Sequence, residues 1–294
     1  MPDHDDLLRS LLRDHWHLAP SRIDALAWGQ MSCAWEVVAG DDRYVCRLVD
    51  SYAARPVEAG LAAAEHLREW GIAVGAPVRT LAGALTATTP AGTLSVSHRV
   101  PGRSLAGADP VDQQWWGDRL GAMHRVLQHF HHPGLRAWQL IDLDAPHLCV
   151  EPWLRPAVAD AVTGTTRLTV TDRLTYGVLH GDPAPAGFVV DPDTGRAGLF
   201  DCGASGTGPL AYDVAAAVVY AGGPVAATEF LDGYLAAGPV HRDEVEAALP
   251  VLIRFRWAVQ ADWSARQLTG GGGCPEVART ALTAAREALE SDAF

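Results

Sequence analysis

The sequence predicts an α+β protein in which a small, mostly antiparallel sheet precedes a larger and mostly helical part. Strand and turn signals typical of hairpins fill residues 28–98, with one helix among them. From residue 110 onward, apolar residues recur mainly at helical spacing. The 294 residues are enough for two such parts, and we expect them to span residues 1–100 and 101–294.

In the first part, leucines at helical spacing behind an acidic start predict an N-terminal helix. Gly40-Asp41-Asp42 predicts the turn of the first hairpin, and Pro56 suits the first turn of the following helix. We expect helices over residues 5–16 and 56–70, and strands over residues 35–39, 44–49, 78–81, 84–88 and 93–98.

In the second part, helices are expected over residues 110–130, 151–162, 167–176, 214–220, 224–237, 243–268 and 275–289. His124 lies near the end of the first of these helices with other His residues close by. No Cys or Asp cluster accompanies them, so a partly exposed helix end is expected here rather than a metal site. Trp257 and Trp263 are expected in the core, as is usual for Trp on a helix.

Composition narrows the classes of partner. The net charge of −12 opposes binding to nucleic acids and anionic membranes, which are themselves negative. The N-terminus M-P-D-H-D-D lacks the basic start of a secretory signal, which favours a cytoplasmic location. The five Cys residues are scattered without a C-x-x-C pair, so reduced thiols are expected.

The candidate catalytic residues lie in the stretch over residues 178–203. An apolar pair delivers His180-Gly181-Asp182, and prolines at once stiffen the following loop. Two short strands then flank the turn signal D-P-D-T-G, and the second strand ends on Asp201-Cys202-Gly203. A hairpin therefore separates two carboxylates. Such a pair suits metal-assisted phosphoryl transfer, in which one carboxylate takes the proton of a hydroxyl and the other holds Mg²⁺.

H-G-D, a hairpin and D-x-G together resemble the aminoglycoside phosphotransferase-like kinases, a family that includes choline and homoserine kinases. The resemblance implies a bilobal protein-kinase-like fold, with ATP and Mg²⁺ as cofactors. It also implies that Asp182 is the catalytic base and Asp201 the metal ligand. The family loop reads H-G-D-x-x-x-x-N, but Gly187 stands at the Asn position, which puts a second metal ion in doubt.

The resemblance assigns further residues to the nucleotide. Arg47 falls at the strand cation that faces the phosphates, and the chain contains no Lys. Glu58 is the preferred helix partner of that cation, with Glu65 as the alternative. The backbone of Arg99 and Val100 is expected to contact ATP at the hinge between lobes.

Two more residues, His180 and Asp213, are expected to support the catalytic loop structurally. The loop over residues 28–34 is expected to lie over the phosphates, although Gly29 is its only glycine.

Three functions remain open from the sequence. The first is transfer of phosphate from ATP to a hydroxyl of a small molecule, such as an aminoglycoside or a natural-product intermediate. The second is phosphorylation of Ser or Thr in a precursor peptide of the lanthipeptide type, which would imply a partner enzyme. The third is a pseudokinase, which Gly187 would explain. No G-x-S-x-G motif or metal-ligand cluster favours a hydrolase.

Overall fold

The computed structural model describes residues 4–26, 32–138, 141–171, 173–270 and 274–291. The chain divides into two compact units, each built from segments that are separate in sequence. The first unit comprises Met1–Ser104, His129–Arg136 and Gly187–Ser205, and the second comprises Leu105–Gln128, Ala137–Ala186 and Gly206–Phe294. The α+β class is confirmed, with antiparallel strands early in the chain and helices later. The lobe boundary after residue 100 stays a prediction.

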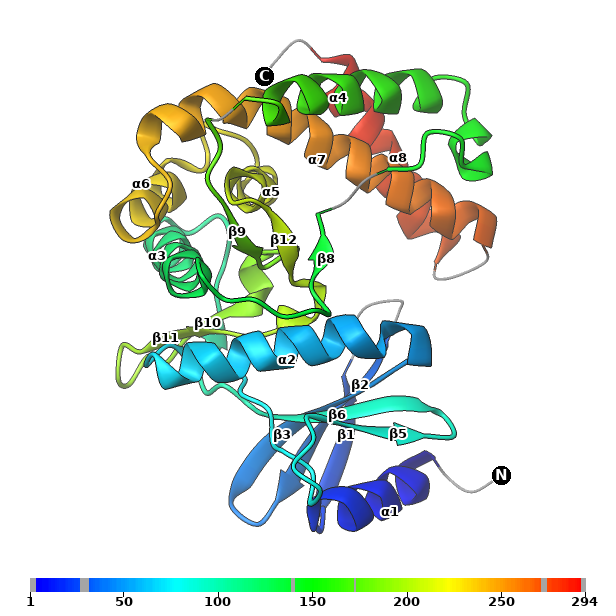
Figure 1. Cartoon of the computed structure of the whole chain (residues 1–294), viewed down its shortest axis with the longest axis vertical. Helices are drawn as coiled ribbons and strands as arrows, with labels where there is room; N and C mark the ends of the chain where they lie inside the picture. Colours follow the sequence, from blue (N-terminus) through cyan, green and yellow to red (C-terminus); the bar gives the residue numbers. More distant parts are fainter. Residues whose placement is uncertain (1–3, 27–31, 139–140, 172, 271–273, 292–294) are drawn as a thin grey trace. The chain divides into compact units, whose positions relative to one another are not determined.

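The larger sheet of the first unit is antiparallel and has the strand order β1-β2-β3-β6-β5. Helix α1 (His4–Trp16) lies against this sheet (Figure 1) and buries Leu8, Leu12 and Trp16 there. The indole N–H of Trp16 donates to the carbonyl of Val78 at 2.8 Å, which fixes the helix to the unit. The strands are β1 (Arg22–Leu26), β2 (Ser32–Ala39), β3 (Asp42–Val49), β5 (Thr86–Thr89) and β6 (Gly92–His98).

A second, smaller sheet of the first unit has the order β4-β11-β10-β7. Its central strands, β10 (Phe188–Val190) and β11 (Ala197–Leu199), form the expected hairpin. Helix α2 (Ala54–Glu69) precedes β4 (Ala73–Val74), which pairs in parallel with β11. Strand β7 (Arg103–Ser104) pairs with β10.

The second unit is mostly helical. Helix α3 (Pro110–Leu127) lies beside α6 (Thr228–Ala237) in Figure 1. The two backbones approach so closely that a Cβ at Gly117 would clash with the carbonyl oxygen of Phe230. The other helices are α4 (Leu154–Thr169), α5 (Ala211–Ala221), α7 (Arg242–Gly270) and α8 (Pro275–Glu290). The strands β9 (Tyr176–Leu179) and β12 (Gly206–Pro209) are antiparallel partners, and β8 (Arg136–Ala137) completes their sheet.

Two predicted elements are wrong. The helix expected over residues 167–176 is absent: α4 ends at Thr169, and Tyr176 opens strand β9. The apolar spacing of this segment is typical of a helix. The β-branched residues Thr169, Val170 and Thr171 have low helix propensity, which favours the end of the helix here. The strand expected over residues 78–81 is instead an extended segment and a turn, in which the N–H of Gly83 donates to the carbonyl of Thr80 at 2.8 Å.

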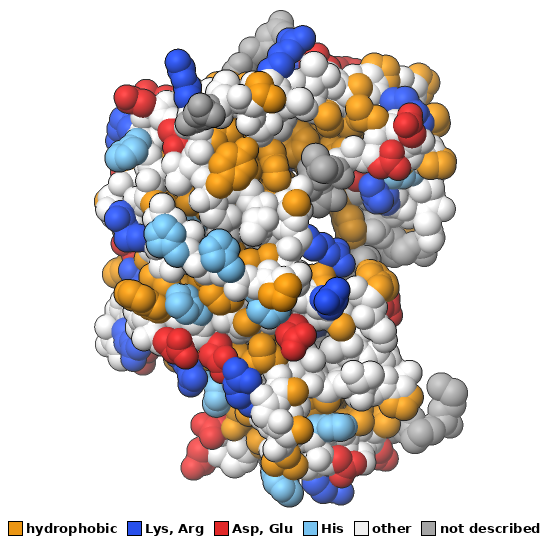
Figure 2. All heavy atoms as spheres, in the orientation of Figure 1, with side chains coloured by type: hydrophobic (Ala, Val, Ile, Leu, Met, Phe, Trp, Pro, Cys, Tyr) orange, Lys and Arg blue, Asp and Glu red, His pale blue; other side chains and the backbone are white. Residues whose placement is uncertain are grey.

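On the face that Figure 2 shows, acidic and Arg side chains are interspersed rather than gathered by sign. No helix in the described part of the chain is both long and apolar enough to cross a membrane.

Candidate active site

The β10–β11 hairpin of the first unit positions Asp201. Every residue of both strands is buried. The N–H of Phe200 donates to the carbonyl of Gly187 at 2.9 Å, which ties the end of one strand to the start of the other. Asp201 then adopts φ 64° and ψ 50°, a left-handed conformation uncommon outside glycine. Such conformations cluster at functional sites.

An ion pair joins Asp201 to Arg47 on β3. Nη2 of Arg47 lies 2.5 Å from Oδ1 of Asp201, and the two side chains are 18% and 40% exposed. The sheet register sets this Arg between Ala34 on β2 and Ser95 on β6. The first unit therefore brings together the expected phosphate-binding cation and the expected metal ligand.

The two Glu residues considered as partners of Arg47 have other surroundings. Glu58 is half-buried on α2, and within the described residues it takes part in no ion pair. Glu65 binds Arg79 through two hydrogen bonds of 2.9 and 2.5 Å. Arg47 thus forms an ion pair with Asp201, on the hairpin rather than on helix α2.

Gly187 stands where the resemblance expects Asn, and its surroundings leave room for a side chain. A Cβ at Gly187 would meet only the carbonyl oxygen of Phe200, at 3.7 Å, and the backbone there is not left-handed. Among the described residues no group of three His, Cys, Asp or Glu side chains could hold a metal. Asp201 alone still fits Mg²⁺, which proteins often bind through one or two carboxylates with phosphate oxygens and water.

Two further Asp residues, Asp191 and Asp193, lie in the turn of the β10–β11 hairpin. Asp191 accepts hydrogen bonds from the Thr194 hydroxyl at 2.7 Å and from the Asp193 N–H at 3.0 Å. The Thr194 hydroxyl is the main cause that lowers the pKa of Asp191. These are the contacts of an Asx turn, so we assign no metal role to either residue.

The segment expected to contact ATP follows β6. The N–H of Arg99 donates to the carbonyl of Arg43 at 2.9 Å, so this donor is already used within the unit. The guanidinium of Arg99 lies 3.3 Å from Glu36, and Val100 is buried. The glycine expected over the phosphates, Gly29, lies outside the described residues.

In the second unit, strand β9 delivers the His180–Asp182 loop, and Asp213 holds it. The carboxylate of Asp213 is fully buried and accepts hydrogen bonds from the N–H of His180 at 2.6 Å and of Gly181 at 3.1 Å. Nε2 of His124 lies 3.1 Å from the same carboxylate, and its Nδ1 lies 2.9 Å from the Tyr234 hydroxyl. The expectation of a partly exposed His124 is wrong, because this polar network accommodates the ring in the core.

Asp182 lines a cavity of about 460 Å³ whose wall comes mostly from α5 and α7. Its Oδ1 accepts a hydrogen bond from the Tyr220 hydroxyl at 2.6 Å and one from Nη2 of Arg256 at 3.0 Å. Burial is the main cause that raises the pKa of Tyr220; the charge of Asp182 adds to this and that of Arg256 opposes it. The tyrosine is thus a protonated donor at neutral pH. The Asp182 side chain remains 53% exposed.

Further charged and aromatic side chains line this cavity. Asp262 is almost fully buried and lies 2.7 Å from Nε2 of His147 and 2.9 Å from Nε of Arg266. Trp263 also lines the cavity and is 38% exposed, so the expectation of a core position is wrong for this residue. Its ring is available to a bound molecule.

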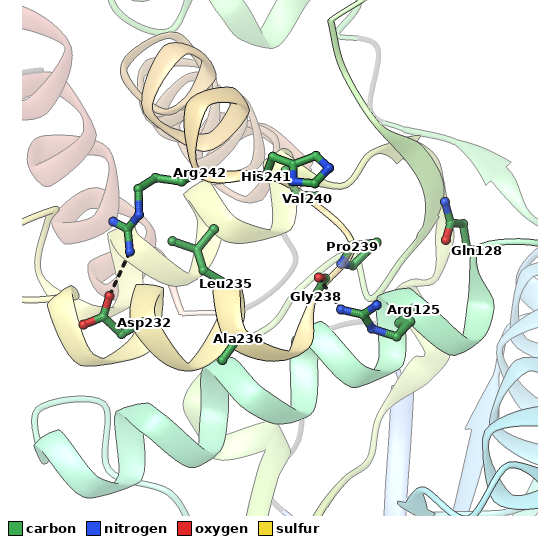
Figure 3. Close-up of a pocket in the computed structure, with 10 residues that line it drawn as sticks. All are labelled: Arg125, Gln128, Asp232, Leu235, Ala236, Gly238, Pro239, Val240, His241 and Arg242. Atoms are coloured by element: carbon green, nitrogen blue, oxygen red, sulfur yellow. Dashed lines mark hydrogen bonds and ion pairs between the residues drawn. The ribbon is translucent and has the colours of Figure 1, made fainter.

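A separate hollow of about 840 Å³ lies between the ends of α3 and α6 and the start of α7 (Figure 3). Arg242 pairs there with Asp232 at 3.3 Å, and Arg125 donates to the carbonyl of Gly238 at 2.7 Å. The Arg125 contact completes the end of helix α6. Both cations therefore have local structural roles, and we place no site here.

The sequence did not connect Tyr220 or Arg256 to Asp182. They lie 38 and 74 residues from Asp182, so no local motif connects them to it. A signal for Arg256 existed: it falls one helical turn after Leu252 and Ile253, on the buried face of α7. A buried Arg on an apolar stripe calls for a charged partner.

Comparison with known proteins identifies the relatives of this chain. Residues 22–248 match a family model described as "Phosphotransferase enzyme family". The homoserine kinase of Methylobacillus glycogenes is 27% identical over 245 residues, which cover 79% of this chain and 76% of that protein.

Solved structures share the fold. An amicoumacin kinase in complex with AMP-PNP and Ca²⁺ superposes with a TM-score of 0.77 at 18% identity, covering 98% of this chain and 93% of that one. A microcompartment-associated aminopropanol kinase gives 0.76 at 20% identity, with 97% and 95% covered. The choline kinase LicA from Streptococcus pneumoniae gives 0.69 at 13% identity, with 97% and 98% covered.

Proposed function

The chain belongs to the phosphotransferase enzyme family, and from this premise we propose that it transfers the γ-phosphate of ATP to a hydroxyl of a compact small molecule. The observation that carries the proposal is Asp182, a half-exposed carboxylate held at one oxygen beside a cavity. Phosphoryl transfer depends mainly on such positioning and on charge compensation.

Three residues have named roles in the reaction. Asp182 orients the acceptor hydroxyl and accepts its proton. Asp201 would hold Mg²⁺, which would offset the negative charge of the phosphates. Arg47, now paired with Asp201, would turn its guanidinium to the phosphates, for which its planar donors are suited.

The charged side chains that line the cavity favour a compact acceptor that carries few positive groups. Each of its two carboxylates is already paired with an Arg, Asp182 with Arg256 and Asp262 with Arg266. An amine-rich acceptor needs carboxylates that are not already neutralised. The exposed ring of Trp263 instead offers an apolar surface. Two relatives are named for small acceptors, homoserine and aminopropanol.

A pseudokinase is the second candidate, because Gly187 removes the side-chain oxygen that the family places near the metal. A protein of this kind would bind ATP without turning it over.

Gly187→Asn separates the two candidates. The Cβ of the new side chain meets only the carbonyl oxygen of Phe200, at 3.7 Å, on a backbone that is not left-handed. The amide oxygen would restore the metal ligand that the family places at this position. We expect the Mg²⁺ concentration for half-maximal turnover to fall by about tenfold, as one more oxygen ligand would give. Gly187→Ala is the control, since it adds a methyl group without an oxygen. The wild type is compared with both variants for ATP binding and for turnover. If the wild type binds ATP without turning it over, and only Gly187→Asn is active, the protein is a pseudokinase.

A further inference from the structure

Three groups of the second unit form a closed triangle at Asp182. Both hydrogen bonds to its carboxylate end on the same oxygen, Oδ1: one from the Tyr220 hydroxyl at 2.6 Å and one from Arg256 Nη2 at 3.0 Å. The same Nη2 also donates to the Tyr220 hydroxyl oxygen at 2.9 Å, which joins the two donors. Within the described residues, Oδ2 of Asp182 accepts no hydrogen bond.

Arg256 is buried more deeply than the carboxylate it holds, and Tyr220 is 39% exposed. The Arg256 side chain is 10% exposed, whereas that of Asp182 is 53% exposed. The guanidinium carbon of Arg256 lies 5.4 Å from the centre of the Tyr220 ring, a cation–π contact that fixes one donor against the other. Arg256 comes from the buried face of α7 and Tyr220 from the last turn of α5. Side chains of helices α5 and α7 thus orient the half-exposed carboxylate of Asp182.

We infer that Arg256 and Tyr220 are positioning residues for phosphoryl transfer, which hold Oδ1 of Asp182 so that Oδ2 faces the acceptor hydroxyl. The inference rests on the proposed function and names the device that orients its base. The acceptor oxygen forms a bond to the γ-phosphorus while the bond from that phosphorus to the bridging oxygen of ADP breaks, and the bridging oxygen keeps the electron pair. The hydroxyl proton passes to Oδ2 and then to water.

The charge of Arg256 has a second consequence. A carboxylate that binds one cation directly offers less attraction to a second one. The arrangement is therefore suited to a neutral hydroxyl at Oδ2 rather than to an ammonium group, which agrees with an acceptor that is not amine-rich.

The test compares the full-length wild type with Tyr220→Phe, Arg256→Lys and Arg256→Ala. The assay measures phosphate release from MgATP with water as the acceptor, and transfer to the best acceptor of a hydroxylated panel. We expect kcat to fall about tenfold in Tyr220→Phe and more in both Arg256 variants, with KM for ATP within about twofold of the wild type, because orientation is lost and nucleotide contacts are not. Millimolar guanidinium chloride should restore part of the activity of Arg256→Ala and none of that of Asp182→Asn.

Two controls are matched to these variants. Arg242→Ala removes another Arg of helix α7, one that pairs with Asp232 on the surface. Tyr176→Phe removes the hydroxyl of an exposed Tyr. Both should keep the wild-type kcat. Thermal unfolding of every variant separates loss of fold from loss of rate. If the wild type is active and Tyr220→Phe and Arg256→Lys, both folded, match its kcat, the positioning role is wrong while the kinase stands. A wild type that turns over with neither water nor the panel overturns the proposed function and this inference with it.

Discussion

Asp182→Asn is expected to lower kcat by about 10²–10⁴-fold, the contribution usual for a general base. The amide has the shape of the carboxylate but cannot take the hydroxyl proton. It also loses the charge that Arg256 and Tyr220 now hold. Because no nucleotide contact is removed, the affinity for MgATP should change little. Steady-state kinetics and calorimetric titration with a non-hydrolysable ATP analogue measure the two quantities.

Asp232→Asn is the matched control, because Asp232 also pairs with an Arg, at 3.3 Å, but on the exposed surface far from any assigned role. It should retain wild-type kinetics, as exposed ion pairs contribute little. A folded Asp182→Asn protein with activity within tenfold of the wild type would remove Asp182 from the reaction.

Asp213→Ala should give the largest loss of stability, about 3–5 kcal/mol, as for a buried charged group removed from its partners. The carboxylate is fully buried and serves the N–H groups of His180 and Gly181 as well as His124. Alanine leaves these donors without an acceptor in the core. Urea unfolding followed by fluorescence measures the effect.

Asp213→Asn keeps one acceptor oxygen and should lose less stability than Asp213→Ala. Asp232→Ala, which removes an exposed carboxylate, should stay within about 0.5 kcal/mol of the wild type. A loss for Asp213→Ala no larger than that of this control would contradict the network described around the loop.

The sequence anticipated the elements whose signals are local. The N-terminal helix, the β2–β3 hairpin and the β10–β11 hairpin with its D-P-D-T-G turn lie where periodicity and turn residues indicated them. The carboxylates Asp182 and Asp201 could be singled out because each belongs to a short motif, H-G-D for the first and D-x-G for the second. These signals depend on neighbours within a few residues, which is all that a single sequence exposes.

Contacts between residues that are far apart in the sequence could not be predicted from such local signals. His124 looked like part of an exposed His cluster, and only its contacts 89 and 110 residues away make it a core residue. The helix predicted over residues 167–176 included Tyr176, which instead pairs with Pro209 of β12 about thirty residues further along the chain, where pairing overrides local preference. The triangle of Tyr220, Arg256 and Asp182 likewise joins three separate elements.

Phosphoryl transfer to a compact hydroxylated acceptor can be followed with labelled ATP. Purified protein is incubated with Mg²⁺ and ATP labelled at the γ-phosphate, together with amino-alcohols, hydroxy-amino acids and aminoglycosides, and label is counted in each acceptor. We predict Mg²⁺-dependent label in a compact acceptor, little in the aminoglycosides, and none with Asp182→Asn. Label found only in amine-rich acceptors, or in no acceptor although ATP binds, would contradict the account.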